Sequence, residues 1–329
     1  MRSSFLLFIC LVFGFIPYHY ADPIKLNVGI YVRSVSLNNK EQCATIDFYY
    51  WFRFKLPEDT SDLASYYNLE VTNGEVQLNE IHETKIIGNN YYVSGHMKGD
   101  FNFVADYENY PFDKQKLMIQ FEHPKYETRD LTLVIDKYSY LKCKTDPNLW
   151  GIPKNLKADG LFIKKSDFVE GCTVYQTDFG DPNITEPTST YSNITFSIYV
   201  SRDFIPYVLK FMIPLIIIMI LAYLVFFIPS NQLDLAAGLT VTSLLAGIAF
   251  QWTISDDLPE VGYLVCVDKI FYLSYILIML AMAQTVWTYH LDQKGKKKLA
   301  DFLETLGQWL FPVVYFGGSL YFMFSSYYS

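Results

Sequence analysis

Long uncharged apolar runs are concentrated at the end of the chain, after a first part in which polar and apolar residues alternate. The runs cover residues 211–228, 235–254, 270–289 and 305–329. Each is close to the roughly 20 residues that an α-helix needs to cross the hydrocarbon core of a bilayer. The pattern therefore predicts four membrane-spanning helices, at about 205–228, 234–254, 264–290 and 304–326.

The part before these runs has the pattern of β-strands. Residues 116–121, 131–135 and 193–200 alternate between polar and apolar, residues 47–55 are dense in aromatics, and turn-forming pairs such as Asn73-Gly74 separate such segments. Short alternating strands separated by turns are typical of a sandwich. We expect an antiparallel β-sandwich of eight to ten strands over residues 22–203, followed by a transmembrane domain over 204–329.

The N-terminus resembles an export signal. A charge at Arg2 precedes a short apolar stretch, residues 5–16, which is typical of a secretory signal peptide over 1–21. His19 fits the small-residue requirement near a cut at Ala21 poorly, so an uncleaved anchor is the alternative. Either way, the sandwich is expected to be exported.

Charges in the loops predict the same topology. Four spans after an exported domain return the C-terminus to the outside and place the loop with Lys294 and residues 296–298 in the cytoplasm, as the positive-inside rule requires. The acidic loop after the second span, with Asp256 and Glu260, then lies outside. We expect a multi-pass protein of the plasma (inner) membrane, with its N-terminal domain and C-terminus extracellular or periplasmic.

Composition narrows the function. The chain of 329 residues carries a net charge of −8, most of it in the exported part. This charge could concentrate cations near a pore mouth, or it could simply keep the domain soluble. No nucleophile elbow, HExxH, phosphate-binding glycine loop or metal-ligand spacing is found, so neither an enzyme nor a nucleic-acid partner is expected. We expect no cofactor, with calcium on acidic clusters as a possible modulator.

The second apolar run has an unusual polar stripe. Steps of three and four residues place on one helical face Asp234, Gly238, Thr242, Leu245, Ala249, Trp252 and Asp256. Hydroxyl groups at this depth, on Thr240, Thr242 and Ser243, suit a water-filled channel better than lipid. The stripe predicts a pore lining.

The cysteines leave their pairing open. Cys10 lies in the signal segment and Cys266 near the third span, while Cys43, Cys143 and Cys172 lie in the exported part. A disulfide between Cys143 and Cys172 is possible, but the odd number leaves at least one thiol free.

Several motifs together resemble a known family. Tyr110-Pro111-Phe112-Asp113, followed by a strand, then Ser201-Arg202 before the first span, Pro214 inside it and Leu258-Pro259 after the second occur in the order found in pentameric ligand-gated ion channels, or Cys-loop receptors. Phe103 and Leu117 stand where animal receptors have the loop cysteines, so the chain is similar to the prokaryotic members. The resemblance implies a homopentamer around the second helix.

The resemblance assigns roles along the stripe. Asp234, with Gly238, falls on the cytoplasmic ring that selects ions, where an acid accompanies cations; its carboxylate could instead only stabilise a helix N-terminus. Leu245 falls on the central hydrophobic gate. Trp252 could form a second gate or belong to the outer aromatic belt.

Other residues fall on the junction between the two domains. Asp113 and Arg202 match an ion pair that couples the sandwich to the membrane domain, although such a pair could also be purely structural. The first hairpin offers Lys40 where many relatives have an acid, and Pro259 falls on the loop that this hairpin meets.

The ligand site is the least defined feature. Tyr175 and Phe179, with Tyr49, Trp51 and Arg53 on a facing strand, could line a pocket between subunits, or they could be ordinary packing residues. The family's tryptophan and proline motif is absent between residues 55 and 110. After the predicted signal peptide, histidines lie at His82, His96, His123 and His290, so protons are a further candidate stimulus.

These features lead to one hypothesis and one alternative. The chain is expected to form a channel for monovalent cations, opened by an extracellular small ligand, by protons or by relief of calcium inhibition. The alternative is a non-conducting β-sandwich that is anchored in the membrane and binds a partner.

Overall fold

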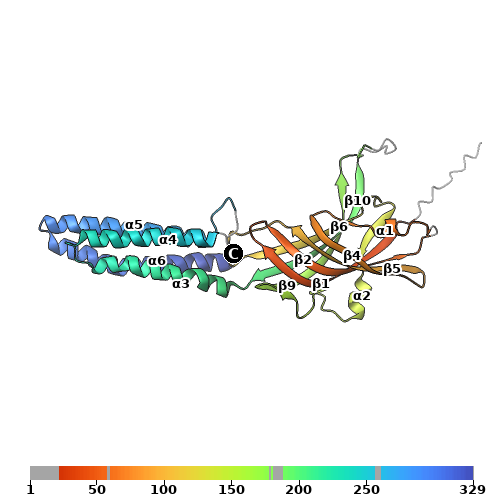
Figure 1. Cartoon of the computed structure of the whole chain (residues 1–329), viewed down its shortest axis with the longest axis horizontal. Coiled ribbons are helices and arrows are strands. Elements are labelled where there is room, and N and C mark those ends of the chain that lie inside the picture. The colour runs from red at the N-terminus through yellow and green to blue at the C-terminus, as the bar shows by residue number, and fades with distance from the viewer. Residues whose placement is uncertain (1–21, 58–59, 178, 181–187, 256–260, 329) are drawn as a thin grey trace, which may run out of the picture.

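The computed structural model describes residues 22–57, 60–177, 179–180, 188–255 and 261–328. In Figure 1 the strands lie at one end of an elongated molecule and the helices at the other. This is the predicted fold class, a β-sandwich followed by helices. The predicted signal peptide with Cys10, and the site residues Asp256 and Pro259, lie outside the described residues.

The sandwich consists of two sheets. The larger sheet has the order β4 (Gly74–Ile87), β5 (Asn90–Asn102), β2 (Cys43–Lys55), β1 (Ile24–Asn38) and β7 (Leu131–Ile135), and β8 (Lys157–Ala158) also pairs with β1. The smaller sheet has the order β3 (Glu70–Val71), β6 (Lys114–Glu122), β10 (Ser189–Arg202) and β9 (Leu161–Tyr175). Pairing is antiparallel except where β7 and β8 run parallel to β1, which the sequence did not predict. Two short helices, α1 (Ala64–Tyr67) and α2 (Lys137–Lys142), lie in the connections.

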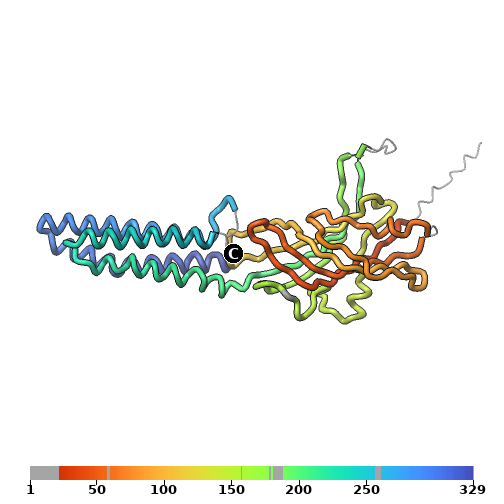
Figure 2. The backbone as a smooth tube through the Cα atoms, viewed as in Figure 1, coloured from red at the N-terminus to blue at the C-terminus, as the bar shows by residue number. Residues whose placement is uncertain are grey.

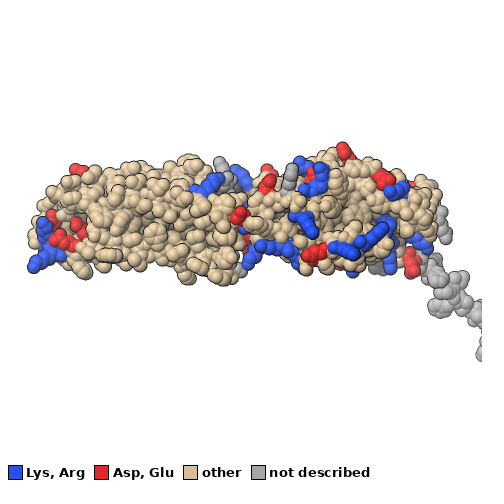
Figure 3. All heavy atoms as spheres, turned by 90° about the horizontal axis from the view of Figure 1, so that it is seen from below, with Lys and Arg blue, Asp and Glu red and all other residues tan. Residues whose placement is uncertain are grey.

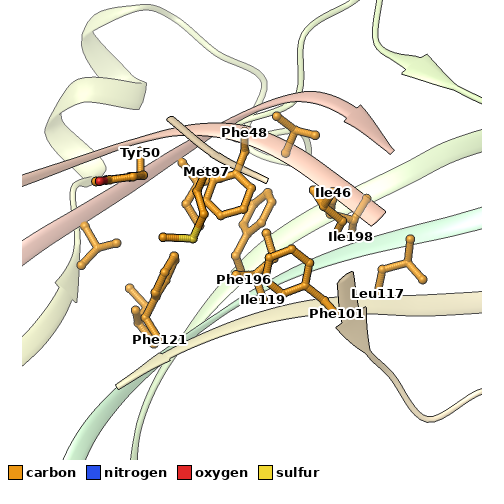
Figure 4. Packing of buried hydrophobic residues seen from close by; sticks show 14 of the residues in the cluster. Ile46, Phe48, Tyr50, Met97, Phe101, Leu117, Ile119, Phe121, Phe196 and Ile198 are labelled. Atoms are coloured by element: carbon orange, nitrogen blue, oxygen red, sulfur yellow. The ribbon is translucent and has the colours of Figure 1, made fainter. Parts of the chain in front are cut away.

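Alternation along the strands builds one core between the sheets. On β2 every second residue from Ala44 to Phe54 is buried. Figure 4 shows Phe48 of β2 among side chains of the other sheet, with its ring 6.2 Å from that of Phe121. The intervening β2 residues therefore face outward, and these include Tyr49, Trp51 and Arg53.

The helical half contains α3 (Phe204–Tyr223), continued by a 3₁₀ turn (Leu224–Phe227), then α4 (Leu233–Ile254), α5 (Cys266–Gln293) and α6 (Lys297–Tyr328). The chain passes from the sandwich along α3 and returns along α4, and the same course is repeated by α5 and α6, so that the C-terminus lies beside the sandwich (Figures 1 and 2). The turn between α5 and α6 lies at the opposite end; it contains Lys294 and Lys296, and Lys297 and Lys298 begin α6.

The surface of the helical half suits a bilayer. On the face in Figure 3, Lys, Arg, Asp and Glu gather at the far end of the helices and at the junction, with an uncharged stretch between. Within the described residues three helical segments are long and apolar enough to cross a membrane, Phe204–Phe227, Leu233–Ile254 and Cys266–Gln293. The predicted fourth span, α6, is not among them. Its apolar stretch is diluted by tyrosines, glycines and polar residues, although α6 packs along α5.

Candidate functional site

The predicted stripe on α4 is uncovered in the single chain. Among its members, Leu245 is 61% exposed and Trp252 is 79% exposed. Asp234, Gly238, Thr242 and Ala249 are exposed as well. The opposite face is buried against the other helices, at Ala236, Thr240, Ser243, Gly247 and Ile254. One face of α4 therefore packs within the chain, and the striped face is left for another surface.

The structure corrects part of the pore prediction. Thr240 and Ser243 lie on the buried face, where their hydroxyl groups donate to the carbonyl oxygens of Ala236 and Leu239, both at 2.9 Å. A hydroxyl that bonds to the preceding turn satisfies its polarity without water. Of the three hydroxyl residues, only Thr242 lies on the exposed face, so the expectation was wrong for the other two.

Contacts behind α4 hold the striped face in its orientation. The Tyr275 hydroxyl of α5 lies 2.8 Å from Oε1 of Gln251 and 3.0 Å from the Gly247 carbonyl oxygen. A Cβ atom at Gly247 would stand 3.0 Å from the Tyr275 ring, so glycine permits this close approach. The C-terminal part of α4 is thus held against α5 on the side away from the stripe.

The junction between the two halves is organised around a buried ion pair. Arg202, the last residue of β10, donates from Nε to Oδ1 of Asp113 at 2.9 Å and from Nη2 to Oδ2 at 3.1 Å. Gln115 donates to Oδ2 of Asp113 at 2.8 Å, and the Tyr110 ring centroid lies 5.0 Å from the guanidinium. Burial alone would lower the pKa of Arg202, but the hydrogen bonds and charge attraction to Asp113, together with the nearby Tyr110 and Tyr207, raise the pKa above its ordinary value. The guanidinium stays charged, and the structure brings both predicted residues together.

A third group completes this junction. Nη2 of Arg202 also donates to Oδ1 of Asn39, in the turn between β1 and β2, at 2.8 Å. Sequence reasoning looked for an acid in this turn and chose Lys40, which is exposed and borders a shallow cavity beside Tyr207. The acceptor is instead a neutral amide one residue earlier, which can accept from a guanidinium without adding charge.

A second contact joins the sandwich to the helices. The backbone N–H of Tyr107, in the loop between β5 and β6, donates to the Tyr263 hydroxyl before α5 at 2.9 Å. Around it a buried cluster includes Phe211 of α3 and Ile270 of α5. The loop that carries the Tyr110–Asp113 motif is therefore packed directly onto the membrane-spanning half. The predicted partner loop at Pro259 lies outside the described residues, so its contact stays a prediction.

The outward aromatic residues of β2 form a structural network. Trp51 donates from Nε1 to Oδ2 of the buried Asp136 at 2.9 Å, and Arg53 donates to Oδ1 at 2.7 Å. The Trp51 ring lies over Gly29, where any Cβ would overlap it. These contacts fix Trp51 and Arg53 at the surface of the larger sheet, whatever else they bind.

Of the other predicted ligand residues, Tyr175 ends β9 of the smaller sheet and Phe179 lies in the turn that follows. Tyr175 donates from its hydroxyl to Oε1 of Glu122 at 2.8 Å, and this bond raises the pKa of Tyr175 to about 12. Its ring lies 5.4 Å from that of Phe179 and 5.8 Å from that of Tyr191. Oε2 of Glu122 is buried without a hydrogen-bond partner among the described residues. This aromatic group and the β2 residues belong to different sheets, so one chain does not bring them together.

The described cysteines form no disulfide. Cys43 and Cys266 are buried, while Cys143 and Cys172 are exposed, and all four are free. The possible bond between Cys143 and Cys172 is therefore absent.

The sequence is distantly similar to those of known ion channels and receptor subunits. The chain is 22% identical over 210 residues to a proton-gated ion channel of Gloeobacter violaceus, covering 64% of the chain and 53% of that protein. It is 25% identical over 203 residues to the pH-sensitive chloride channel 2 of Drosophila melanogaster, covering 60% and 36%. It is 23% identical over 204 residues to the acetylcholine receptor subunit delta of Gallus gallus, covering 59% and 37%. At this low identity, the chain is similar to ion channels and receptor subunits of the pentameric ligand-gated ion channel family.

The similarity to these proteins is weak and covers only part of each sequence. No family model matches the chain. The matched part spans about half or less of the length of these relatives. The similarity therefore rests on low identity over part of each protein.

Proposed function

We propose that the chain assembles as a homopentamer in the membrane and forms a cation-selective channel opened by an extracellular stimulus. The observation that carries the proposal is the uncovered stripe on α4. Its reverse face is packed within the chain, while Asp234, Thr242, Leu245 and Trp252 face outward together. A ring of identical helices would turn this one mixed face toward a shared lumen.

The charge at the start of the stripe supports selectivity for cations. Asp234 is exposed in the first turn of α4, at the end of the helices far from the sandwich. Five carboxylates around a narrow opening would attract partly dehydrated cations and repel anions. One relative is named as a chloride channel, so family membership alone does not decide the sign of the permeant ion.

Protons are the first stimulus to test, and a small ligand is the second. Two of the relatives are named as proton-gated or pH-sensitive. The small-ligand reading is supported by Tyr175, Phe179 and Tyr191 around the unpartnered oxygen of Glu122, because aromatic faces and a carboxylate together suit a cationic ligand. Bound to the sandwich, either stimulus would act through Asp113 and Arg202 on α3 and α4, provided that it favours the open state.

The deciding experiment is the reversal potential of reconstituted protein in a sodium chloride gradient, scanned from neutral to acidic pH and with calcium present or absent. We expect a reversal potential near that of sodium, which collapses in Asp234→Ala. Asp301→Ala is the matched control, since it removes an exposed acid at the same end of the molecule but on α6.

Leu245→Ala separates a closed channel from a protein that does not conduct. Weakening a hydrophobic constriction should produce current without any stimulus. Silence in both wild type and Leu245→Ala, from protein shown to be pentameric, would contradict the proposal and favour the membrane-anchored binding protein.

A further inference from the structure

Two histidines and a glutamate converge on the outer face of the larger sheet, away from the junction and from α4. Glu80 and His82 lie on β4, and His96 lies on β5 directly opposite Glu80. One ligand atom from each of the three lies within 4.8 Å of the others. The register of β4 against β5 shifts between Ile81 and Glu83, so His82 sits at a bulge. A bulge is a common means of re-aiming a side chain at a site.

A second observation orients one of these histidines for metal binding. Nε2 of His96 lies 2.8 Å from Oδ1 of Asp47 on β2. Nη1 of Arg33 lies 3.0 Å from the same nitrogen, and these two contacts favour opposite tautomers. In the tautomer whose Nε2–H donates to Asp47, the lone pair on Nδ1 is free as a ligand. Histidines that bind metals nearly always donate their other N–H to a carboxylate or carbonyl in this way. His96 thus has the outer-shell partner that a metal ligand requires.

The charged neighbours leave the cluster able to accept a cation. Nη1 of Arg33 lies 3.4 Å from Oδ1 of Asp47 and 3.0 Å from Nε2 of His96, and its guanidinium lies 5.2 Å from the Tyr49 ring centroid. Arg33 is therefore balanced by Asp47, which leaves the Glu80 carboxylate to offset a bound ion. On the same strands, Glu83 is paired with Lys85 at 2.9 Å, and Lys98 follows His96 by two residues.

We propose that Glu80, His82 and His96 bind a divalent transition-metal ion, zinc being the best match. Two imidazoles and one carboxylate are a common ligand set for zinc, whereas calcium prefers six or more oxygen ligands. Tetrahedral bonds of about 2.0–2.1 Å bring ligand atoms to about 3.4 Å from one another. Glu80 and His82 are exposed and can close this small gap by rotating, and water can occupy the fourth position.

The test measures binding directly, on the full-length protein purified in detergent. Cobalt(II) substitutes for zinc and gives visible absorption bands when its coordination is tetrahedral. We expect about one tightly bound ion per chain, displaced by zinc but not by calcium, and a higher melting temperature in the presence of zinc. His82→Ala and His96→Ala should each abolish the cobalt bands and this shift.

Two further variants test the arrangement of the site. Asp47→Asn should keep the ligands but weaken the metal affinity by about 10–100-fold, the usual effect of losing an outer-shell partner. His290→Ala, at the far end of α5, is the matched control and should bind metal like wild type. Circular dichroism and gel filtration confirm that each variant is folded.

The proposal is overturned if wild type binds no cobalt or zinc at micromolar concentration, or if binding survives both histidine substitutions. The measurement does not depend on current through the protein. Failure of the channel experiment would therefore leave this site untouched, and the reverse also holds.

Discussion

Arg202 and Asp113 form a two-point ion pair across 89 residues of sequence, with both side chains almost completely buried. Arg202 ends β10 and is followed at once by α3, while Asp113 ends the loop that rests on the helices. The pair therefore lies where the smaller sheet meets α3.

Removing one partner of this pair should lower the free energy of unfolding more than removing both. Arg202→Gln alone leaves a buried carboxylate without its counter-charge, and losses of about 3–5 kcal/mol are typical of such changes. The double variant Asp113→Asn/Arg202→Gln should recover part of this loss. Thermal unfolding of the purified protein, followed through a double-mutant cycle, checks the coupling energy. Arg129→Gln is the control, because the exposed pair of Arg129 with Glu127 should contribute only about 0–1 kcal/mol.

Asn39 should matter for the same junction. Asn39→Ala removes an acceptor from Nη2 of Arg202 and should cost about 1.5–3 kcal/mol, the range for a hydrogen bond to a charged group. Asn39→Asp restores an acceptor and should recover most of the melting temperature. An unchanged melting temperature in Asn39→Ala would show that water replaces the amide without loss.

The sequence predicted those strands and helices that have a regular repeat of apolar residues. β2 and α4 lie close to the segments predicted for them. Burial of one face imposes a repeat of two residues along a strand and of 3.6 residues along a helix, and both repeats can be read in the sequence. The same reasoning identified the exposed stripe, since its spacing is a property of one helix. It could not assign Thr240 and Ser243 to the packed face, because that depends on where α5 lies.

Contacts between distant segments were harder to foresee. Asn39 was missed because nothing local marks an amide as the partner of an arginine 163 residues away. The cluster of Glu80, His82 and His96 was missed for a similar reason, since only the pairing of β4 with β5 makes neighbours of these residues. Parallel pairing of β7 with β1 likewise leaves no mark in either strand alone.

His123 should make the sandwich less stable in mild acid. Its ring is buried, Nδ1 accepts from the backbone N–H groups of Lys125 and Tyr126, and Nε2 lies 2.7 Å from the Ser65 carbonyl oxygen. These contacts fit the neutral ring, and burial lowers the pKa of His123 below its ordinary value of 6.5. The unfolded chain then takes up the proton first, so this contribution is present above pH 6.5 and is lost as the pH falls below it.

Melting temperatures measured between pH 7.5 and pH 5 check this dependence. His123→Asn keeps an acceptor near the two N–H groups but cannot titrate there, so it should melt lower at pH 7.5 and depend less on pH. Equal slopes for wild type and His123→Asn would contradict the assignment.

Substitution of Trp252 tests whether its side chain forms a second gate or belongs to the outer aromatic belt. It lies on the exposed face of α4 with Leu245, seven residues and thus about 10 Å further along the axis. If α4 lines the pore, Trp252→Ala widens a constriction, so conductance or open probability should rise several-fold at a fixed stimulus. If the ring instead anchors the helix in lipid, its removal should lower stability without changing the open current.

Trp309→Ala is the matched control, because Trp309 is 73% exposed on α6 and should change neither conductance nor opening. Single-channel recording of the two variants against wild type separates the readings, and equal currents in all three would remove Trp252 from the gate.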